Sequence, residues 1–103
     1  MEAPETCVVQ HHRILAALGE RIRVLRNRKG LSQETLAFEL DVHRTYVGLI
    51  EQARRYPSMQ MLIRLSEKLD VTLAELFLGV EDRAKTLSKP GRPLKPGPPG
   101  RRP

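Results

Sequence analysis

Two short segments with the apolar spacing of helices, separated by only an Asp-Val interruption, restrict the fold of this chain more than any other feature. They lie within LSQETLAFELDVHRTYVGLIEQ, residues 31–52. The apolar positions that would face inward are Leu36, Ala37, Leu40, Val47 and Ile50. Helices this short each bury a single stripe, so a tight turn would place the second across the first and leave its outer face free.

Residues at the ends of both segments suit helix termini. Ser32 is a good N-cap for the first segment. Asp41 follows it, and aspartate is one of the few residue types besides glycine that enters the left-handed conformation at tolerable cost. The second segment would begin at about His43. We therefore predict a helix-turn-helix motif over residues 33–52.

Three further helical segments flank this motif. The segment before it ends at Gly30, a candidate C-cap, and its apolar stripe is formed by Leu15, Leu18, Ile22 and Leu25. After the motif, Ser58 would cap a fourth helix, and TLAE, residues 72–75, is a capping box that would open a fifth. Aromatic residues are scarce (two Tyr, two Phe, no Trp), so aliphatic side chains must build the core. This composition suits an all-α fold of five helices.

Composition divides the chain into a folded part and a tail. Residues 81–103 hold six of the eight prolines and show no apolar periodicity, so we expect a disordered tail rich in Pro, Gly and basic residues. The helix-turn-helix domain would occupy residues 12–80. Residues 1–11 would form an N-terminal arm or an extension of the first helix.

Most of the positive charge lies in the tail. Residues 1–80 carry a net charge of +1 and residues 81–103 a net charge of +5, of the +6 for the whole chain. This balance points to polyanionic partners, but it does not distinguish nucleic acid from an acidic membrane or from mere solubility. Cys7 stands alone, and neither a secretory signal nor an apolar run of membrane-spanning length occurs, so we expect a cytoplasmic protein without a membrane partner.

The free face of the second helix carries candidate DNA-contacting residues. The first residues of a helix in the major groove meet base edges, where Arg44 could bind guanine O6 and N7, and Thr45 could donate to a base or pack on a thymine methyl. Leu49, one turn further, can supply only an apolar contact. Gln33, at the start of the preceding helix, could bind a phosphate together with free backbone amides.

Residues 18–77 resemble the phage-repressor and Cro-like (XRE-type) helix-turn-helix domains. The resemblance rests on LGERIRVLRNRKGLSQETLAFEL, RTYVGLIEQ, RRYPS and the close L..L...LDVTLAELF, and covers about 60 of the 103 residues. It implies a five-helix lambda-repressor-like fold and a transcription regulator. It also implies base-reading roles for Arg44, Thr45 and Leu49 with His43 beside them, a phosphate-anchoring role for Gln33, and a buried structural ion pair between Arg26 and Glu51.

Three positions depart from the family pattern. Asp41 occupies the turn position where glycine is usual. His43 replaces the serine or threonine that usually opens the recognition helix, which weakens the expected N-cap there. Ala53 replaces a loop glycine, although Arg54 and Arg55 restore positive charge for phosphate contacts.

Other features favour a structural interpretation over a functional one. The ring of Tyr46 is expected to pack against the core, with its hydroxyl reaching a phosphate at most. Cys7 and His11 are too few ligands for a metal, and we expect no cofactor. No nucleophile or glycine-rich phosphate loop accompanies the histidines, so we expect no enzyme. KPGRPLKP, residues 89–96, is similar to a minor-groove AT-hook core, but Pro90 replaces its first arginine and a basic linker is favoured.

The assembly and the function each have two interpretations. Apolar surface on the fifth helix and Phe77–Val80 would be covered by a homodimer, which we favour, or by a first helix lengthened through residues 5–15. The favoured function is a sequence-specific double-stranded-DNA-binding transcriptional regulator, a repressor at a palindromic operator with half-sites about 34 Å apart. The alternative is an antitoxin-type module that binds a protein partner and uses DNA binding for autoregulation.

Overall fold

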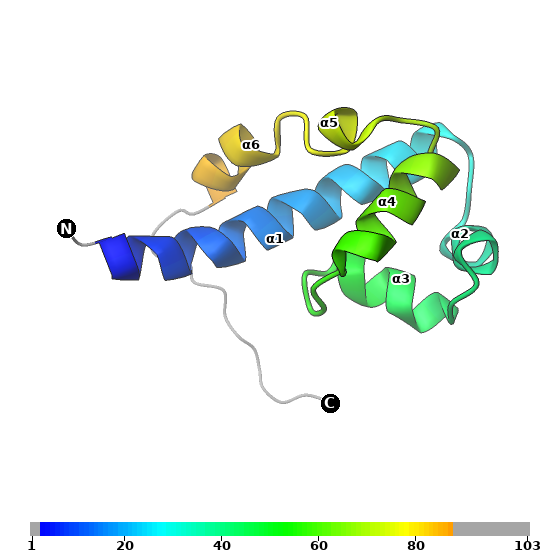
Figure 1. Cartoon of the computed structure of the whole chain (residues 1–103), viewed down its shortest axis with the longest axis horizontal. Coiled ribbons are helices and arrows are strands. Elements are labelled where there is room, and N and C mark those ends of the chain that lie inside the picture. The colour runs from blue at the N-terminus through cyan, green and yellow to red at the C-terminus, as the bar shows by residue number, and fades with distance from the viewer. Residues whose placement is uncertain (1–2, 88–103) are drawn as a thin grey trace.

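The computed structural model describes residues 3–87, with side chains from residue 11 onward (Figure 1). This part of the chain is helical and contains no strand. In chain order the helices are α1 (Ala3–Arg28), α2 (Gln33–Leu40), α3 (Arg44–Glu51), α4 (Met59–Lys68), α5 (Leu73–Leu76) and α6 (Val80–Leu87). The all-α prediction is confirmed, and the five predicted helices correspond to α1–α5.

The long helix α1 is the axis of the fold. Figure 1 shows α5 and α6 along one side of α1, while α2, α3 and α4 gather on another side near its carboxyl end. The core between them is aliphatic, as the composition predicts, and its most completely buried members are Ile22, Leu36, Leu40, Val47, Ile50, Leu65 and Leu76. Gly30, with φ of 75°, follows the end of α1 in the left-handed conformation that a C-cap glycine adopts.

The helix α5 is fixed at its start by the predicted capping box. The backbone N–H of Glu75 donates to the Thr72 hydroxyl over 3.0 Å, and the Thr72 N–H donates to the Glu75 carboxylate over 2.9 Å. Arg21 of α1 donates from Nη2 to the backbone carbonyl of Glu75 over 2.8 Å. The capping bonds close the first turn of a four-residue helix that is too short to be stable alone, and the Arg21 bond attaches it to α1.

The helix α6 corrects the predicted start of the tail. We expected the folded part to end at Val80, but Val80–Leu87 is helical and packs on α1. Val80 and Ala84 are buried in this contact and Leu87 packs against the same core, a helical spacing of four and three residues. This short pattern was not recognised in the sequence because it runs directly into the Pro- and Gly-rich stretch. Residues 88–103, which include the AT-hook-like segment, lie outside the described residues, as does the side chain of Cys7.

The helix α1 also extends toward the N-terminus. It begins at Ala3, so of the two predicted forms for residues 1–11 the helix extension is present. The apolar surface around Phe77–Val80 is divided by this arrangement, because Val80 is buried while Leu78 remains 65% exposed. Packing inside the chain therefore covers only part of the surface for which a partner was predicted.

Gly19 allows α1 and α3 to meet. A Cβ atom at this position would lie 2.5 Å from the carbonyl oxygen of Glu51 and 2.7 Å from that of Ile50. Both neighbours are backbone atoms, so they could not move without displacing the end of α3. Gly19 was not predicted as a contact from the sequence, although an isolated glycine within a helical stripe often marks a close approach of this kind.

Candidate nucleic-acid interface

The turn between α2 and α3 is built around Asp41. Its backbone is left-handed, with φ of 62° and ψ of 45°, as the sequence indicated. The N–H groups of Asp41 and Val42 donate back to the carbonyls of Phe38 and Ala37, over 3.1 and 3.0 Å. These bonds close the last turn of α2 and send the chain directly into α3.

A second contact holds the end of α2. Arg64 of α4 donates from Nη2 to the carbonyl of Leu40 over 2.6 Å. A guanidinium at the end of a helix both satisfies a free carbonyl and interacts favourably with the helix dipole. The turn is therefore fixed from α4 as well as from within. This link was not predicted from the sequence, because the two residues lie 24 positions apart.

The helix α3 has an effective N-cap at His43, which corrects the expectation that this residue weakens the cap. The His43 backbone is extended, with φ of −73° and ψ of 145°, and its Nδ1 accepts the N–H of Thr45 over 3.1 Å. Nδ1 is three bonds from Cα, the same number that separates Cα from the acceptor oxygen of a capping asparagine. Histidine therefore fulfils here the role that serine or threonine usually fills.

The first turn of α3 faces outward. His43, Arg44 and Thr45 are exposed, whereas Val47 and Ile50 are each 2% exposed and face the core. Gly48 and Leu49 are partly exposed. The short helix therefore has one buried stripe, and a surface helix with this pattern leaves its other side chains free to contact a partner.

Tyr46 and the loop after α3 form the edge of this surface. Tyr46 is half-buried against the core, and the guanidinium carbon of Arg55 lies 5.6 Å from its ring centre, a cation–π arrangement. Ala53 adopts a left-handed backbone with φ of 62°, so the chain turns as it would with the glycine that is usual there. Arg54 and Arg55 are both exposed.

A buried polar network anchors the far end of α3. Arg26 donates to the carboxylate of Glu51 from Nε over 2.6 Å and from Nη2 over 3.1 Å. It also donates from Nη1 to the carbonyl of Leu31 over 2.9 Å. The side chain of Glu51 is only 2% exposed, so these bonds form where water competes little.

Gln33 takes part in the same network. Its amide nitrogen donates to Glu51 over 3.0 Å, and its amide oxygen lies near Gly48, 3.6 Å from where a Cβ would be. The structure therefore places Gln33 against α3, with one of its amide hydrogens already used. From the sequence only a phosphate contact is predicted for this residue, and the bond to Glu51 is a finding of the structure.

The charge on this surface is positive. Glu51 is the single acidic residue of α3, and its carboxylate is paired with Arg26. Arg44 on the helix and the two arginines of the following loop remain at the surface. A rigid helix with an exposed polar first turn and arginines at its edge matches the chemistry of a DNA major groove, in which base edges lie between rows of phosphates.

A helix-turn-helix family model matches residues 22–76, more than half of the chain. The chain belongs to the helix-turn-helix family. The motif described above lies within the matched region, and the identification of XRE-type regulators from the sequence is confirmed. The protein is a DNA-binding helix-turn-helix transcriptional regulator.

Several relatives of this helix-turn-helix protein are control proteins. Control protein C.MunI of Mycoplasma sp. is 41% identical over 64 residues, which cover 61% of this chain and 86% of the relative. Control protein C.BamHI of Bacillus amyloliquefaciens is 38% identical over 60 residues, covering 57% of this chain and 74% of the relative. Both alignments span most of the relative's length.

Solved structures with similar folds include a controller protein and a gene regulator. The restriction-modification controller protein C.AhdI of Aeromonas hydrophila superposes with a TM-score of 0.59 at 45% identity, covering 60% of this chain and 94% of that protein. The clp gene regulator ClgR of Corynebacterium glutamicum has a TM-score of 0.68 at 23% identity and supports the fold alone. Among the described helices of this helix-turn-helix protein, none has the length and apolar character of a membrane span.

Proposed function

We propose that this protein is a sequence-specific regulator that binds double-stranded DNA by inserting α3 into the major groove. Its similarity to C.MunI, C.BamHI and C.AhdI further favours control of a restriction–modification operon as its role. The observation that carries the proposal is the outward first turn of α3, fixed at its start by His43 and at its end by Glu51. Repression is the regulatory outcome that we favour.

In the proposed complex, α3 contacts the bases through hydrogen bonds from its first turn and through an apolar contact one turn later. Arg44 would bind guanine O6 and N7 with its two parallel donors, and Thr45 would contact the adjacent base. Leu49, which is partly exposed one turn later, would pack on a thymine methyl. These contacts are expected to determine which sequence is bound.

Phosphate contacts would set the position of α3 on the duplex. The amide nitrogen of Gln33 has a second hydrogen beyond the one donated to Glu51, and this hydrogen is available to a phosphate oxygen. Arg55, stacked on Tyr46, and Arg54 beside it would bind phosphates at the other end of α3. Glu51 and Tyr46 would thus act as positioning residues for the phosphate contacts.

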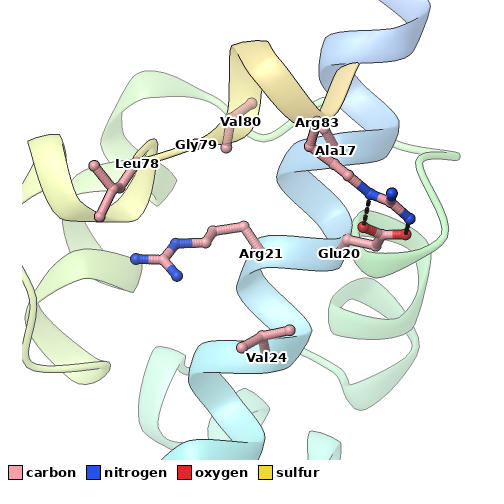
Figure 2. A pocket seen from close by; sticks show the side chains of 8 residues that line it. All are labelled: Ala17, Glu20, Arg21, Val24, Leu78, Gly79, Val80 and Arg83. Atoms are coloured by element: carbon pink, nitrogen blue, oxygen red, sulfur yellow. Dashed lines mark hydrogen bonds and ion pairs between the residues drawn. The ribbon is translucent and has the colours of Figure 1, made fainter. Parts of the chain in front are cut away.

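A second copy of the chain is the proposed cover for the apolar surface left on α1 and on the connection between α5 and α6. A groove of about 180 Å³ lies between α1 and the segment from Leu78 to Arg83. In Figure 2, Leu78 lies on one side of Arg21 and the Glu20–Arg83 ion pair on the other, with Val24 farther along α1. Val24 is 47% exposed and Leu78 is 65% exposed. A two-fold dimer through this surface would present two α3 helices to a palindromic operator.

The proposal is tested by selection from random double-stranded DNA followed by sequencing. Enrichment of a two-fold symmetric motif is the expected result, and binding without any enriched motif would overturn sequence-specific recognition. Sedimentation of the Leu78→Glu variant tests the dimer separately, since a charge in the interface should dissociate it. If wild type and variant both sedimented as monomers, the dimer would be contradicted. The proposal for DNA recognition would not be affected.

A further inference from the structure

The N-cap of α3 determines the protonation pattern of the His43 ring. Nδ1 accepts the N–H of Thr45 over 3.1 Å, and a nitrogen that accepts a hydrogen bond must present a lone pair. In a neutral imidazole one nitrogen carries the proton and the other accepts. The cap therefore places the proton of the neutral ring on Nε2.

The same geometry sets the direction in which that proton points. Nδ1 is directed back toward the N–H of Thr45, and Nε2 lies on the opposite edge of the ring. His43 is exposed, and within residues 11–87 no side chain or backbone group makes a hydrogen bond to Nε2. The Nε2–H group is therefore free at the surface next to Arg44, the first residue of α3.

We propose that His43 is a specificity-determining residue that offers DNA one hydrogen-bond donor and no acceptor. This inference rests on the proposed insertion of α3 into the major groove. Base partners of the right chemistry are purine N7, guanine O6 and thymine O4, all of which accept. The amino groups of adenine and cytosine do not match, because they need an acceptor that the cap has already used.

A serine or threonine cap would not have this property to the same extent. A capping hydroxyl has its oxygen at the helix amide and its hydrogen close to the backbone, whereas the imidazole carries its donor across the width of a ring. The departure from the family pattern at position 43 therefore adds a donor that extends further toward the DNA. Cap and donor are two functions of one side chain, and substitutions can separate them.

Two variants separate these functions in the full-length chain. His43→Ser retains a preferred capping residue but removes the extended donor, while His43→Asn retains the cap through its amide oxygen and offers an amide N–H in place of Nε2–H. Thermal unfolding of both variants checks that the cap is retained. Their DNA preferences are then measured by selection from random duplexes, and their affinities on the wild-type site at several salt concentrations.

The expected result is that His43→Ser binds the best site roughly 3- to 10-fold more weakly, the effect of one hydrogen bond, and that His43→Asn recovers part of this loss. If Nε2–H contacts a base, the loss of preference is confined to one base pair. If the loss is uniform across sequences, Nε2–H contacts a phosphate and the specificity role is overturned. The salt slope would then be unchanged, because a neutral N–H donor neutralises no phosphate. Equal affinity and the same motif for His43→Ser and wild type would overturn the proposal.

A spectroscopic measurement tests the ring itself and does not depend on DNA. Two-bond proton–nitrogen correlation spectra of the 15N-labelled protein at about pH 8.5, where an ordinary imidazole is neutral, report which ring nitrogen is protonated. The His43 signals are identified by their loss in His43→Asn. The Nε2–H form is expected, and the Nδ1–H form would overturn the proposal. Failure of the wild type to enrich any motif would instead count against the proposed function.

Discussion

Gly19 of α1 lies against the carboxyl end of α3, so close that a Cβ atom would stand 2.5 Å from the carbonyl oxygen of Glu51. Real Cβ atoms do not approach a carbonyl oxygen to this distance. Since α1 and α3 are both packed into the core, neither helix can withdraw without separating buried side chains. Position 19 must therefore be glycine for α3 to lie where it does.

The first prediction concerns this contact. Gly19→Ala should lower the free energy of unfolding by about 2–3 kcal/mol, the upper part of the range for overpacked cores. Gly48→Ala is the matched control, because a Cβ there would meet only the side chain of Gln33 at 3.6 Å. Inside a helix that change should be neutral or stabilise by up to about 1 kcal/mol. Urea unfolding measures both, and equal stability of the two variants would contradict the packing described.

The second prediction concerns the ion pair of Arg26 and Glu51. Arg26→Ala should destabilise the domain by about 3–5 kcal/mol, because it leaves the Glu51 carboxylate, which is 2% exposed, without its cation. Replacing both residues by methionine should cost less than removing one, since no buried charge then remains unpaired. A double variant less stable than Arg26→Ala would show that the pair contributes more than mutual neutralisation.

The third prediction uses the backbone at Ala53. Its φ of 62° lies in the left-handed region, where a Cβ costs about 1–2 kcal/mol. Ala53→Gly should stabilise the protein by about 0.5–1 kcal/mol, because relief of this strain outweighs the greater freedom of glycine in the unfolded chain. Ala74→Gly, the same change at an exposed position in α5, should destabilise. Thermal unfolding measures both variants. A lower unfolding midpoint for Ala53→Gly than for wild type would contradict backbone strain at Ala53.

The fourth prediction concerns base readout. Arg44→Ala should cost about 1–3 kcal/mol of binding free energy on the best site and relax the preference at one base pair. Lys68→Ala removes the same charge from an exposed position in the last turn of α4 and should leave the selected motif unchanged. If random-duplex selection returned the same motif for Arg44→Ala as for wild type, the role given to Arg44 would be wrong.

The fifth prediction concerns acid stability. Arg83 donates to the carboxylate of Glu20 from Nε over 2.8 Å, and this bond holds the pKa of Glu20 below its ordinary value, while partial burial opposes the shift. A carboxyl whose pKa is lower in the folded state stabilises the fold above its unfolded value, near 4.3, and loses that contribution as the pH falls through the folded pKa. Unfolding midpoints followed between about pH 7 and pH 2 should therefore decline less steeply in Glu20→Gln than in wild type.

The effect of this exposed pair should be small, because solvent screens it. Glu39→Gln, on α2, removes one carboxylate away from Arg83 and serves as the control. A Glu20→Gln profile that fell in parallel with wild type would show that the pair does not couple to folding.

The sequence predicted those parts of the fold that depend on local patterns. Ser32, Ser58 and the Thr72–Glu75 box cap their helices as expected, because a capping residue acts within three positions of itself. The left-handed turn at Asp41 follows for the same reason. The aliphatic stripes gave the helices and most of the core, since helical spacing is visible without knowledge of the partner helix.

The features that the sequence did not predict are contacts between distant segments. The bond from Arg64 to Leu40 and the fit of Gly19 against Glu51 depend on how helices cross. The docking of α6 rests on Val80, Ala84 and Leu87 and on the bond from Arg83 to Glu20, 63 positions apart. His43 was misjudged for a different reason, because its capping ability depends on a rotamer that brings Nδ1 to the N–H of Thr45.

The anchoring of α3 at both ends has a consequence for engineering. Eight residues are too few to hold a helix in water, so its order comes from the histidine before it, the glutamate at its end and the buried valine and isoleucine between them. Of these four positions only His43, through its proposed Nε2–H donor, would touch a base. The surface residues at 44, 45, 48 and 49 could therefore be exchanged as a set, so that the same scaffold would be retargeted to new operators without redesign of its interior.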